Sequence, residues 1–400
     1  MKLAIIKERK SPPDRRVVFS PKACQNLLKV YKQLSICVEP SDIRAYTDAQ
    51  YTQAGLTLST DLSNCEVLMG VKEVPINSLI PNKSYFFFSH TIKKQAYNRP
   101  LLQAVLEKNI TLYDHEVLTN NKGLRLVAFG YYAGIVGAYN AIRTYGLKSQ
   151  NFTLPKASQI HDKQALIQIL KNTKLPAIKI VLTGKGRVGN GVLEILNGMG
   201  LKQVEPNAFL TESFNQAVFT QIDVEAYNIK KDRTPFTQAD FFKDASVFES
   251  NFMRFAKVAD VYIVGHFYAN GAPYIFTRQD AKNPDFNIKV IADISCDVDG
   301  PIASTIRSST IENPIYGYDP KTEKEVDYLN PKAIAVMAVD NLPCELPIDA
   351  SDGFGQMFLD HVMPAFFNGD ADGILSRAKM TENGKLTPRF AYLQDFVAGK

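Results

Sequence analysis

A glycine triplet in the middle of the chain constrains its fold more than any other feature. Gly184, Gly186 and Gly189 directly follow an apolar segment at residues 178–183, and they precede a helix-patterned run at residues 192–199. Glycine permits a tight turn and a close backbone approach, while the N-terminus of a helix presents unpaired N–H groups to a pyrophosphate. The pattern predicts a dinucleotide-binding unit of the Rossmann type. The alternative is a tight glycine turn that binds no ligand.

A ribose-binding carboxylate is expected at the end of the next strand, roughly 20 residues beyond such a glycine turn. Glu205 ends the segment LKQVE and is the first candidate. On spacing alone, a solvated carboxylate at a strand end is an equally good interpretation of Glu205. Asp223, at the end of VFTQID, is a weaker competitor.

The rest of the chain has the rhythm of an α/β protein. Residues 2–121 alternate short β-rich segments with helix-like segments, which predicts βαβ units and a parallel sheet. The apolar stretch from Val127 to Tyr145 spaces Gly130, Gly134 and Gly137 three to four residues apart, so we expect a helix packed against another backbone. A helix beginning near Asp349 should return to the first domain. We predict a substrate and catalytic domain at 1–134 plus 348–400, and a dinucleotide-binding domain at 135–347.

Composition excludes several other classes of protein. The net charge of +5, from 46 basic and 41 acidic residues, is spread without the basic runs that nucleic acids or membrane surfaces require. The five cysteines are odd in number and never in CxxC spacing, which argues against a disulfide framework and a zinc site. No signal-peptide core or membrane-spanning run is evident in the sequence. We expect a protein of the reducing cytoplasm, without a metal, that acts on small molecules as a monomer or homo-oligomer.

The first domain offers groups for acid–base chemistry and for binding carboxylates. Lys72 ends the strand-like EVLMGVK and His90 ends YFFFSH, so we expect both at the carboxyl edge of a parallel sheet, where such sheets bind ligands. By pattern alone, a solvated surface lysine and a hydrogen-bonded structural histidine are the alternatives. Arg16 follows a proline-rich turn, and Arg125 lies in the otherwise apolar LRLVAFG. An arginine in a half-buried run needs an anionic partner, either a substrate carboxylate or an internal carboxylate. The other histidines have weaker cases: His115, His161, His266 and His361.

These residues recur in a pattern that spans nearly the whole chain. Its parts are KERKSPPDRRVVFSP, GVKEVP, YFFFSHTIKKQ, TLYDHE, LRLVAFGYYAG, LTGKGRVGNG, ADISCDVDG, STIENPIYGYDP and VDNLPCELPIDASDGFG. The pattern resembles the L-lysine-forming saccharopine dehydrogenases, and most closely the lysine-ketoglutarate reductase half of the aminoadipic semialdehyde synthases. The wider clan includes alanine dehydrogenase and the transhydrogenase α subunit. The resemblance implies two Rossmann-like domains with parallel sheets, separated by a cleft.

The resemblance also implies a reaction and a set of residues. Saccharopine, water and an oxidised nicotinamide cofactor would give lysine, 2-oxoglutarate and the reduced cofactor. Lys72 would act as base and His90 as acid, with Glu73 and Glu116 tuning them electrostatically. The implied substrate-binding residues are Arg16, Lys72, Gln95, Arg125 and Phe129. The implied cofactor-binding residues are Gly184, Gly186, Arg187, Gly189, Glu205, Phe267, Tyr268, Asp293, Ile294 and Ser295.

Two positions depart from the fungal members of this family. The fungal enzymes carry an arginine where this chain has Leu124, and a disulfide-forming cysteine where it has Val188. The animal reductase domain is aliphatic at the first position, so that departure is compatible with activity. For the cofactor we expect NAD, because Glu205 would repel the 2′-phosphate of NADP. NADP remains an alternative, because Arg187 could bind its 2′-phosphate.

Three other functions remain as alternatives. An alanine dehydrogenase would share the lysine, the histidine and the glycine loop, but its small substrate would not require both Arg125 and Gln95. An imine reductase for another pair of amino acid and keto acid is the second alternative. A nucleotide-sensing protein that kept the fold without turnover is the third, and the presence of both Lys72 and His90 argues against it.

Overall fold

The computed structural model describes residues 1–269 and 271–400. Within this part, the chain divides into two compact units. Unit 1 is made of Met1–Phe129 and Pro347–Lys400, and unit 2 is made of Gly130–Leu346. The two units are described separately below.

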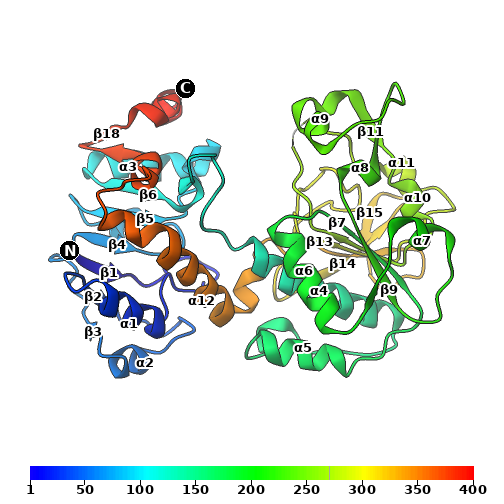
Figure 1. The fold of residues 1–400 in the computed structure, drawn as a ribbon, viewed down its shortest axis with the longest axis horizontal. Coiled ribbons are helices and arrows are strands. Elements are labelled where there is room, and N and C mark those ends of the chain that lie inside the picture. Colours follow the sequence, from blue (N-terminus) through cyan, green and yellow to red (C-terminus); the bar gives the residue numbers. More distant parts are fainter. Residues whose placement is uncertain (270) are drawn as a thin grey trace. The chain divides into compact units, whose positions relative to one another are not determined.

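Unit 1 is built on an all-parallel sheet whose strands lie in the order β3-β2-β1-β4-β5-β6 (Figure 1). Alternate residues of β1 belong to different apolar clusters: Leu3 and Ile5 to one, Ala4 to the other. The sheet is therefore buried on both faces, as parallel sheets usually are. The strands of unit 1 are β1 (Lys2–Ile5), β2 (Ser35–Val38), β3 (Thr57–Leu58), β4 (Val67–Met69), β5 (Ser84–Phe87), β6 (Thr111–Asp114), β17 (Thr381–Glu382) and β18 (Lys385–Leu386).

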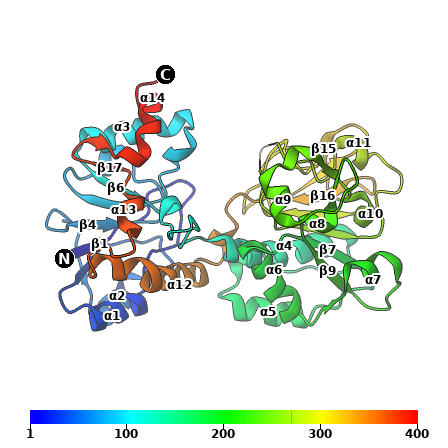
Figure 2. The same cartoon turned by 45° about the horizontal axis from the view of Figure 1, so that its top comes forward.

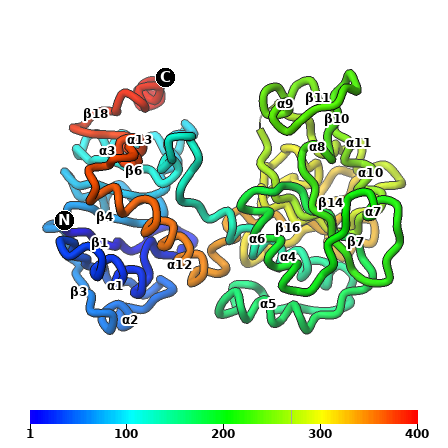
Figure 3. Tube along the Cα trace, viewed as in Figure 1, coloured from blue at the N-terminus to red at the C-terminus, as the bar shows by residue number. Residues whose placement is uncertain are grey.

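The C-terminal segment completes the core of unit 1. Helix α12 lies beside α1, although they are far apart in the sequence (Figure 3). Phe354 on α12 and Phe358 beyond it are fully buried, and Phe358 packs edge-on against Phe19 at 5.7 Å between ring centroids. The helices of unit 1 are α1 (Pro21–Val30), α2 (Asp48–Gln53), α3 (Arg99–Glu107), α12 (Pro347–Met357), α13 (Ile374–Ala378) and α14 (Gln394–Val397).

Unit 2 contains a larger sheet in the order β15-β14-β16-β13-β12-β7-β9-β8. It is parallel from β16 to β8, while β14 and β15 add an antiparallel edge. The expected α/β fold with parallel sheets is thus confirmed, apart from this edge. The strands of unit 2 are β7 (Lys179–Thr183), β8 (Lys202–Gln203), β9 (Val218–Ile222), β10 (Asn228–Lys230), β11 (Phe248–Ser250), β12 (Val261–Val264), β13 (Val290–Asp293), β14 (Ile315–Asp319), β15 (Lys324–Val326) and β16 (Ile334–Met337).

Two long helices, α4 and α6, pack against each other in unit 2 (Figure 2). A Cβ atom at Gly191 of α6 would lie 2.0 Å from the carbonyl oxygen of Tyr131, and one at Gly134 of α4 would lie 2.0 Å from that of Val188. The expected close packing of the glycine-spaced helix is confirmed. The helices of unit 2 are α4 (Gly130–Ser149), α5 (Lys163–Lys171), α6 (Arg187–Gly198), α7 (Pro206–Thr211), α8 (Val224–Tyr227), α9 (Gln238–Lys243), α10 (Met253–Ala256) and α11 (Arg278–Ala281).

Substitution of Gly191 by alanine should destabilise unit 2, because the added methyl group meets backbone atoms that have no rotamer to change. We expect Gly191→Ala to lower the free energy of unfolding by about 2 kcal/mol or more. Asn197→Ala, at an exposed position of the same helix, is the matched control and should change it by less than about 0.5 kcal/mol. Urea unfolding of the three proteins measures both values. Equal midpoints for Gly191→Ala and the wild type would contradict the close contact.

Candidate functional site

The carboxyl ends of four neighbouring strands bring the ionisable residues of unit 1 to one edge of its sheet. Glu8 follows β1, Lys72 follows β4, His90 follows β5 and Glu116 follows β6. Because these strands are parallel and adjacent, the loops after them lie at the same edge, where open α/β sheets bind ligands. Lys72 and His90 follow directly neighbouring strands.

His90 is oriented by a carboxylate. Its Nδ1 atom lies 2.6 Å from Oε1 of Glu73, and its ring lies nearly parallel to that of Phe88. Burial by itself would raise the pKa of Glu73, but the hydrogen bond from His90, the backbone and the charges of His90 and Lys10 lower it to about 2. Glu73 is therefore ionised at neutral pH and fixes one edge of the imidazole ring.

Lys72 is positioned through its backbone by Glu8, a residue that the sequence did not single out. The amide of Val71 donates to Oε1 of Glu8 at 2.7 Å, and the amide of Lys72 donates to Oε2 at 2.8 Å. Glu8 is buried, and burial together with the charge of Asp14 raises its pKa to about 7, although the two amides favour the ionised form. One carboxyl group thus ties the loop after β1 to the end of β4.

A second buried carboxyl group ties β5 to β6. Asp114 accepts hydrogen bonds from the amide of Ser89 at 3.0 Å and from the amide of Glu116 at 2.7 Å, and also from the Ser89 hydroxyl. The neighbouring His115 is fully buried and donates from Nε2 to the carbonyl of Gly70 at 2.9 Å. Burial lowers the pKa of His115 to about 4, so it is a neutral structural histidine.

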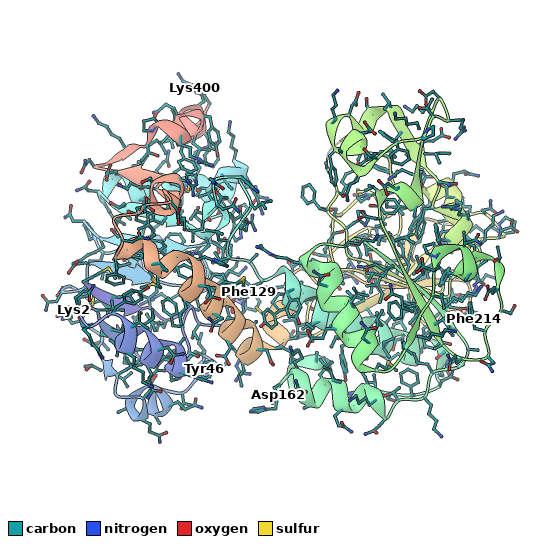
Figure 4. The ribbon with its side chains drawn as sticks, viewed as in Figure 1. Lys2, Tyr46, Phe129, Asp162, Phe214 and Lys400 are labelled. Atoms are coloured by element: carbon teal, nitrogen blue, oxygen red, sulfur yellow. The ribbon has the colours of Figure 1, made fainter. Side chains whose placement is uncertain are left out.

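Arg16 is buried against a carboxylate two residues before it. Its Nε and Nη2 atoms donate to the two oxygens of Asp14 at 3.0 and 2.6 Å, and both side chains are 2% exposed. Burial alone would raise the pKa of Asp14, but the charge and hydrogen bonds of Arg16, with the charge of Lys72, lower it. The Arg16 guanidinium lies 4.1 Å from the ring centroid of Phe129, the residue labelled in Figure 4. The ring of Phe129 stacks in turn on that of Phe354 of α12.

Arg125 lies on the surface, so the expectation of a half-buried run at this arginine was wrong. Leu124 is 63% exposed, and the buried run starts at Val127. Arg125 donates from Nε to the backbone carbonyl of Glu116 at 3.1 Å.

Lys93 lies 3.3 Å from Oε1 of Glu116, whereas Oε2 of Glu116 is buried without a hydrogen-bond partner among the described residues. Gln95 is exposed and accepts from the hydroxyl of Tyr97.

In unit 2, the three predicted glycines differ in their surroundings, and two of them leave no room for a side chain. Gly184 has a φ of +95°, and a Cβ there would lie 2.6 Å from the carbonyl oxygen of Gly265. A Cβ at Gly189 would lie 2.2 Å from the carbonyl oxygen of Gly184, whereas a Cβ at Gly186 would meet nothing within 4 Å. Gly186 also begins α6 without a side-chain cap. The arrangement fits a dinucleotide: a tight turn, close packing of helix on strand, and open space before the helix N-terminus.

A pocket of about 820 Å³ opens in front of this turn. It is bounded by the loops that follow β7, β9, β12 and β13, together with α9. The lining residues are Gly184, Lys185, Gly186, Arg187, Val188, Asp223, Val224, Tyr227, Gln238, Phe242, Gly265, His266, Phe267, Tyr268, Ser295 and Asp297. Most of the predicted cofactor residues line it: Gly184, Gly186, Arg187, Phe267, Tyr268 and Ser295.

Four predicted cofactor residues do not line this pocket. Gly189 packs on the backbone of Gly184. Asp293 is fully buried and accepts hydrogen bonds from the hydroxyls of Ser295 and Thr305, both at 2.7 Å. Ile294 is buried and belongs to the core cluster of α4 and the sheet. Glu205 is exposed at the start of α7.

The strand order explains why Glu205 lies elsewhere. The strand paired with β7 on this side is β9, while β8 pairs with β9 at the sheet edge. The carboxylate that follows the strand next to β7 is therefore Asp223, and it lines the pocket. Asp223 accepts from the amide of Val224 at 2.8 Å and from Nε2 of Gln238 at 3.1 Å.

Sequence comparison connects the chain with known oxidoreductases. Residues 4–136 match the family model described as alanine dehydrogenase/PNT, N-terminal domain. The chain is 28% identical to the mitochondrial alpha-aminoadipic semialdehyde synthase of Rattus norvegicus, over 98% of this chain and 47% of that protein. It is 25% identical to saccharopine dehydrogenase [NAD(+), L-lysine-forming] of Yarrowia lipolytica, over 88% of this chain and 89% of that protein.

The chain is thus similar in sequence to saccharopine dehydrogenases and to alpha-aminoadipic semialdehyde synthases. The resemblance stated from the sequence motifs is therefore confirmed. The chain spans about half the length of the synthases it matches, 47% for the rat protein.

Solved structures show the same fold. An L-alanine dehydrogenase matches with a TM-score of 0.64 at 15% identity, over 99% of this chain and 100% of that one. The transhydrogenase from Sinorhizobium meliloti matches with a TM-score of 0.62 at 15% identity, over 97% and 100% of the two chains. No helix among the described residues is long and apolar enough to cross a membrane.

The protonation of Glu8 should make stability depend on pH. Its folded-state pKa is raised from 4.5 to about 7, so its contribution to stability is present below about pH 4.5 and is lost as pH rises through about 7. Glu8→Gln removes this contribution. We expect the loss of unfolding free energy between about pH 5 and pH 8 to be smaller in the variant than in the wild type, by about 2 kcal/mol.

Urea unfolding at both pH values measures this difference. Glu107→Gln, at an exposed position of α3, should keep the wild-type dependence on pH. If Glu8→Gln showed the same loss as the wild type, Glu8 would not be the group that changes its protonation.

Proposed function

We propose that this chain is an NAD-dependent oxidoreductase acting on CH–NH groups, and that it interconverts saccharopine with lysine and 2-oxoglutarate. The observation that carries the proposal is the placement of Lys72 and His90 after directly neighbouring strands, with His90 held by an ionised Glu73. The similarity over nearly the full length of a saccharopine dehydrogenase supports the choice of substrate.

The cofactor belongs to unit 2. When bound, an oxidised nicotinamide accepts a hydride from the substrate. The open space at Gly186 and the uncapped start of α6 would receive the pyrophosphate, and Asp223 would accept hydrogen bonds from the adenosine ribose. Asp223 supports NAD over NADP, because its carboxylate would repel a 2′-phosphate. It takes the role that the sequence spacing had given to Glu205.

The substrate belongs to unit 1. Oxidation of saccharopine removes a hydride from the carbon that carries both a carboxylate and the secondary amine, and water then splits the resulting imine. Lys72 would accept the proton from the amine, and His90 would protonate the amine that leaves as lysine. Glu73 keeps His90 in one orientation, and Glu8 keeps the backbone of Lys72 in place.

The two predicted arginines receive different roles. Saccharopine has three carboxylates, and the exposed Arg125 suits one of them. Arg16 already donates two hydrogen bonds to Asp14 and stacks on Phe129. We therefore assign it the role of positioning Asp14 and Phe129 rather than binding a carboxylate of the substrate. Gln95 is exposed on the loop after β5 and suits a second carboxylate.

The choice of substrate and cofactor is tested with the purified protein. We expect saccharopine to reduce NAD, seen as a rise in absorbance of the reduced nicotinamide, and the rate with NADP to be lower. Alanine with NAD should give no more than background. Reduction driven by alanine alone would favour an alanine dehydrogenase, and no saccharopine turnover with either cofactor would contradict the proposal.

The roles of Lys72 and His90 are tested by substitution. Lys72→Met and His90→Gln should each lower kcat by about 100-fold or more, because positioned acids and bases contribute about that much. NADH affinity, measured by calorimetry, should stay within about twofold, because the cofactor site lies in unit 2. Lys22→Met, at an exposed position of α1, is the matched control and should keep wild-type kcat. Loss of NADH affinity in the two variants, with kcat unchanged, would contradict the assignment.

A further inference from the structure

An exposed phenylalanine lines the nucleotide pocket at a position that no predicted cofactor residue occupies. Phe242 is 69% exposed and lies on α9, in the upper part of unit 2 in Figure 1. Its neighbour Phe241 is buried and packs against Phe248 at 5.2 Å between ring centroids. The helix is thus anchored through Phe241, while the ring of Phe242 stays at the pocket wall. Such a large apolar ring left in solvent is suited to covering a flat ligand.

Helix α9 is joined to the segment after β9, which includes α8, by two hydrogen bonds of one residue. Gln238 donates from Nε2 to Asp223 at 3.1 Å, and its backbone amide donates to the carboxylate of Glu225 at 2.8 Å. Gln238 and Phe242 are four residues apart on the helix, so they share the face that meets Asp223. The position of the Phe242 ring is therefore set relative to the carboxylate that we assign to the ribose.

We propose that Phe242 forms the adenine subsite of the cofactor by stacking on the purine ring. The order of groups within the dinucleotide leads to this position. The pyrophosphate is attached to one end of the ribose and the adenine to the other, so a molecule with its pyrophosphate at Gly186 and its ribose at Asp223 carries its base beyond Asp223. The lining residues found there are Val224, Gln238 and Phe242. This inference rests on the proposed dinucleotide function of unit 2.

Stacking would make Phe242 a determinant of affinity for the adenosine half alone. Loss of the stacking of a base on an aromatic side chain weakens binding by about tenfold or more. We therefore expect Phe242→Ala to weaken ADP-ribose binding by about tenfold in calorimetry, and Phe242→Tyr to restore most of it. Because Phe242 is exposed, these variants should keep the wild-type melting temperature.

The absence of tryptophan from the sequence allows a direct reporter. Phe242→Trp would place the single tryptophan of the chain at the proposed subsite. ADP-ribose should quench its fluorescence, whereas nicotinamide mononucleotide, which lacks adenine, should not. Tyr392→Trp, at a 51% exposed position in unit 1, is the matched control and should show no quenching by either compound.

The outcomes separate this inference from the function on which it rests. Quenching at position 242 alone, with weaker ADP-ribose binding to Phe242→Ala, supports the adenine subsite. If ADP-ribose binds the wild type but neither quenches Phe242→Trp nor loses affinity in Phe242→Ala, the subsite is overturned and the nucleotide function stands. If neither ADP-ribose nor NADH binds the wild type, the proposed function is overturned together with the subsite.

Discussion

The close approach of backbone to backbone around the turn from β7 into α6 is the constraint on which unit 2 depends. A Cβ atom at Gly189 would collide with the carbonyl oxygen of Gly184, and one at Gly191 would collide with that of Tyr131 in α4. Side chains at these positions would push α6 away from both the sheet and α4. The same approach leaves the first turn of α6 uncapped beside the open position of Gly186. A packing requirement and an anion-binding geometry therefore come from one short segment.

In unit 1, buried carboxyl groups hold the ends of neighbouring strands together at one edge of the sheet. Glu8 joins the loop after β1 to the amides at the end of β4, and Asp114 joins the ends of β5 and β6. Each satisfies backbone donors that would otherwise be buried without partners. The loops that carry Lys72, His90 and Glu116 are held in this way by residues that would not touch the substrate.

The sequence predicted those parts of the fold that depend only on residues close together in the chain. The glycine turn, the strand before it and the glycine-spaced helix α4 all follow from sequence spacing. Sequence spacing could not show that Asp223, rather than Glu205, is the carboxylate that lines the pocket beside the glycine turn. That placement depends on β9, rather than β8, pairing with β7. The exposure of Arg125 and the pairing of Arg16 with Asp14 also depend on tertiary packing. The apolar residues next to each arginine in the sequence do not predict either feature.

The proposed reaction transfers a hydride between a nicotinamide cofactor and the carbon of saccharopine that carries both a carboxylate and the secondary amine. The most direct test supplies lysine, 2-oxoglutarate and NADH deuterated at the transferable position, and analyses the products by mass spectrometry. We expect saccharopine that carries one deuterium on the carbon derived from C2 of 2-oxoglutarate. Formation of deuterated glutamate or alanine in place of saccharopine, or saccharopine without deuterium, would contradict it.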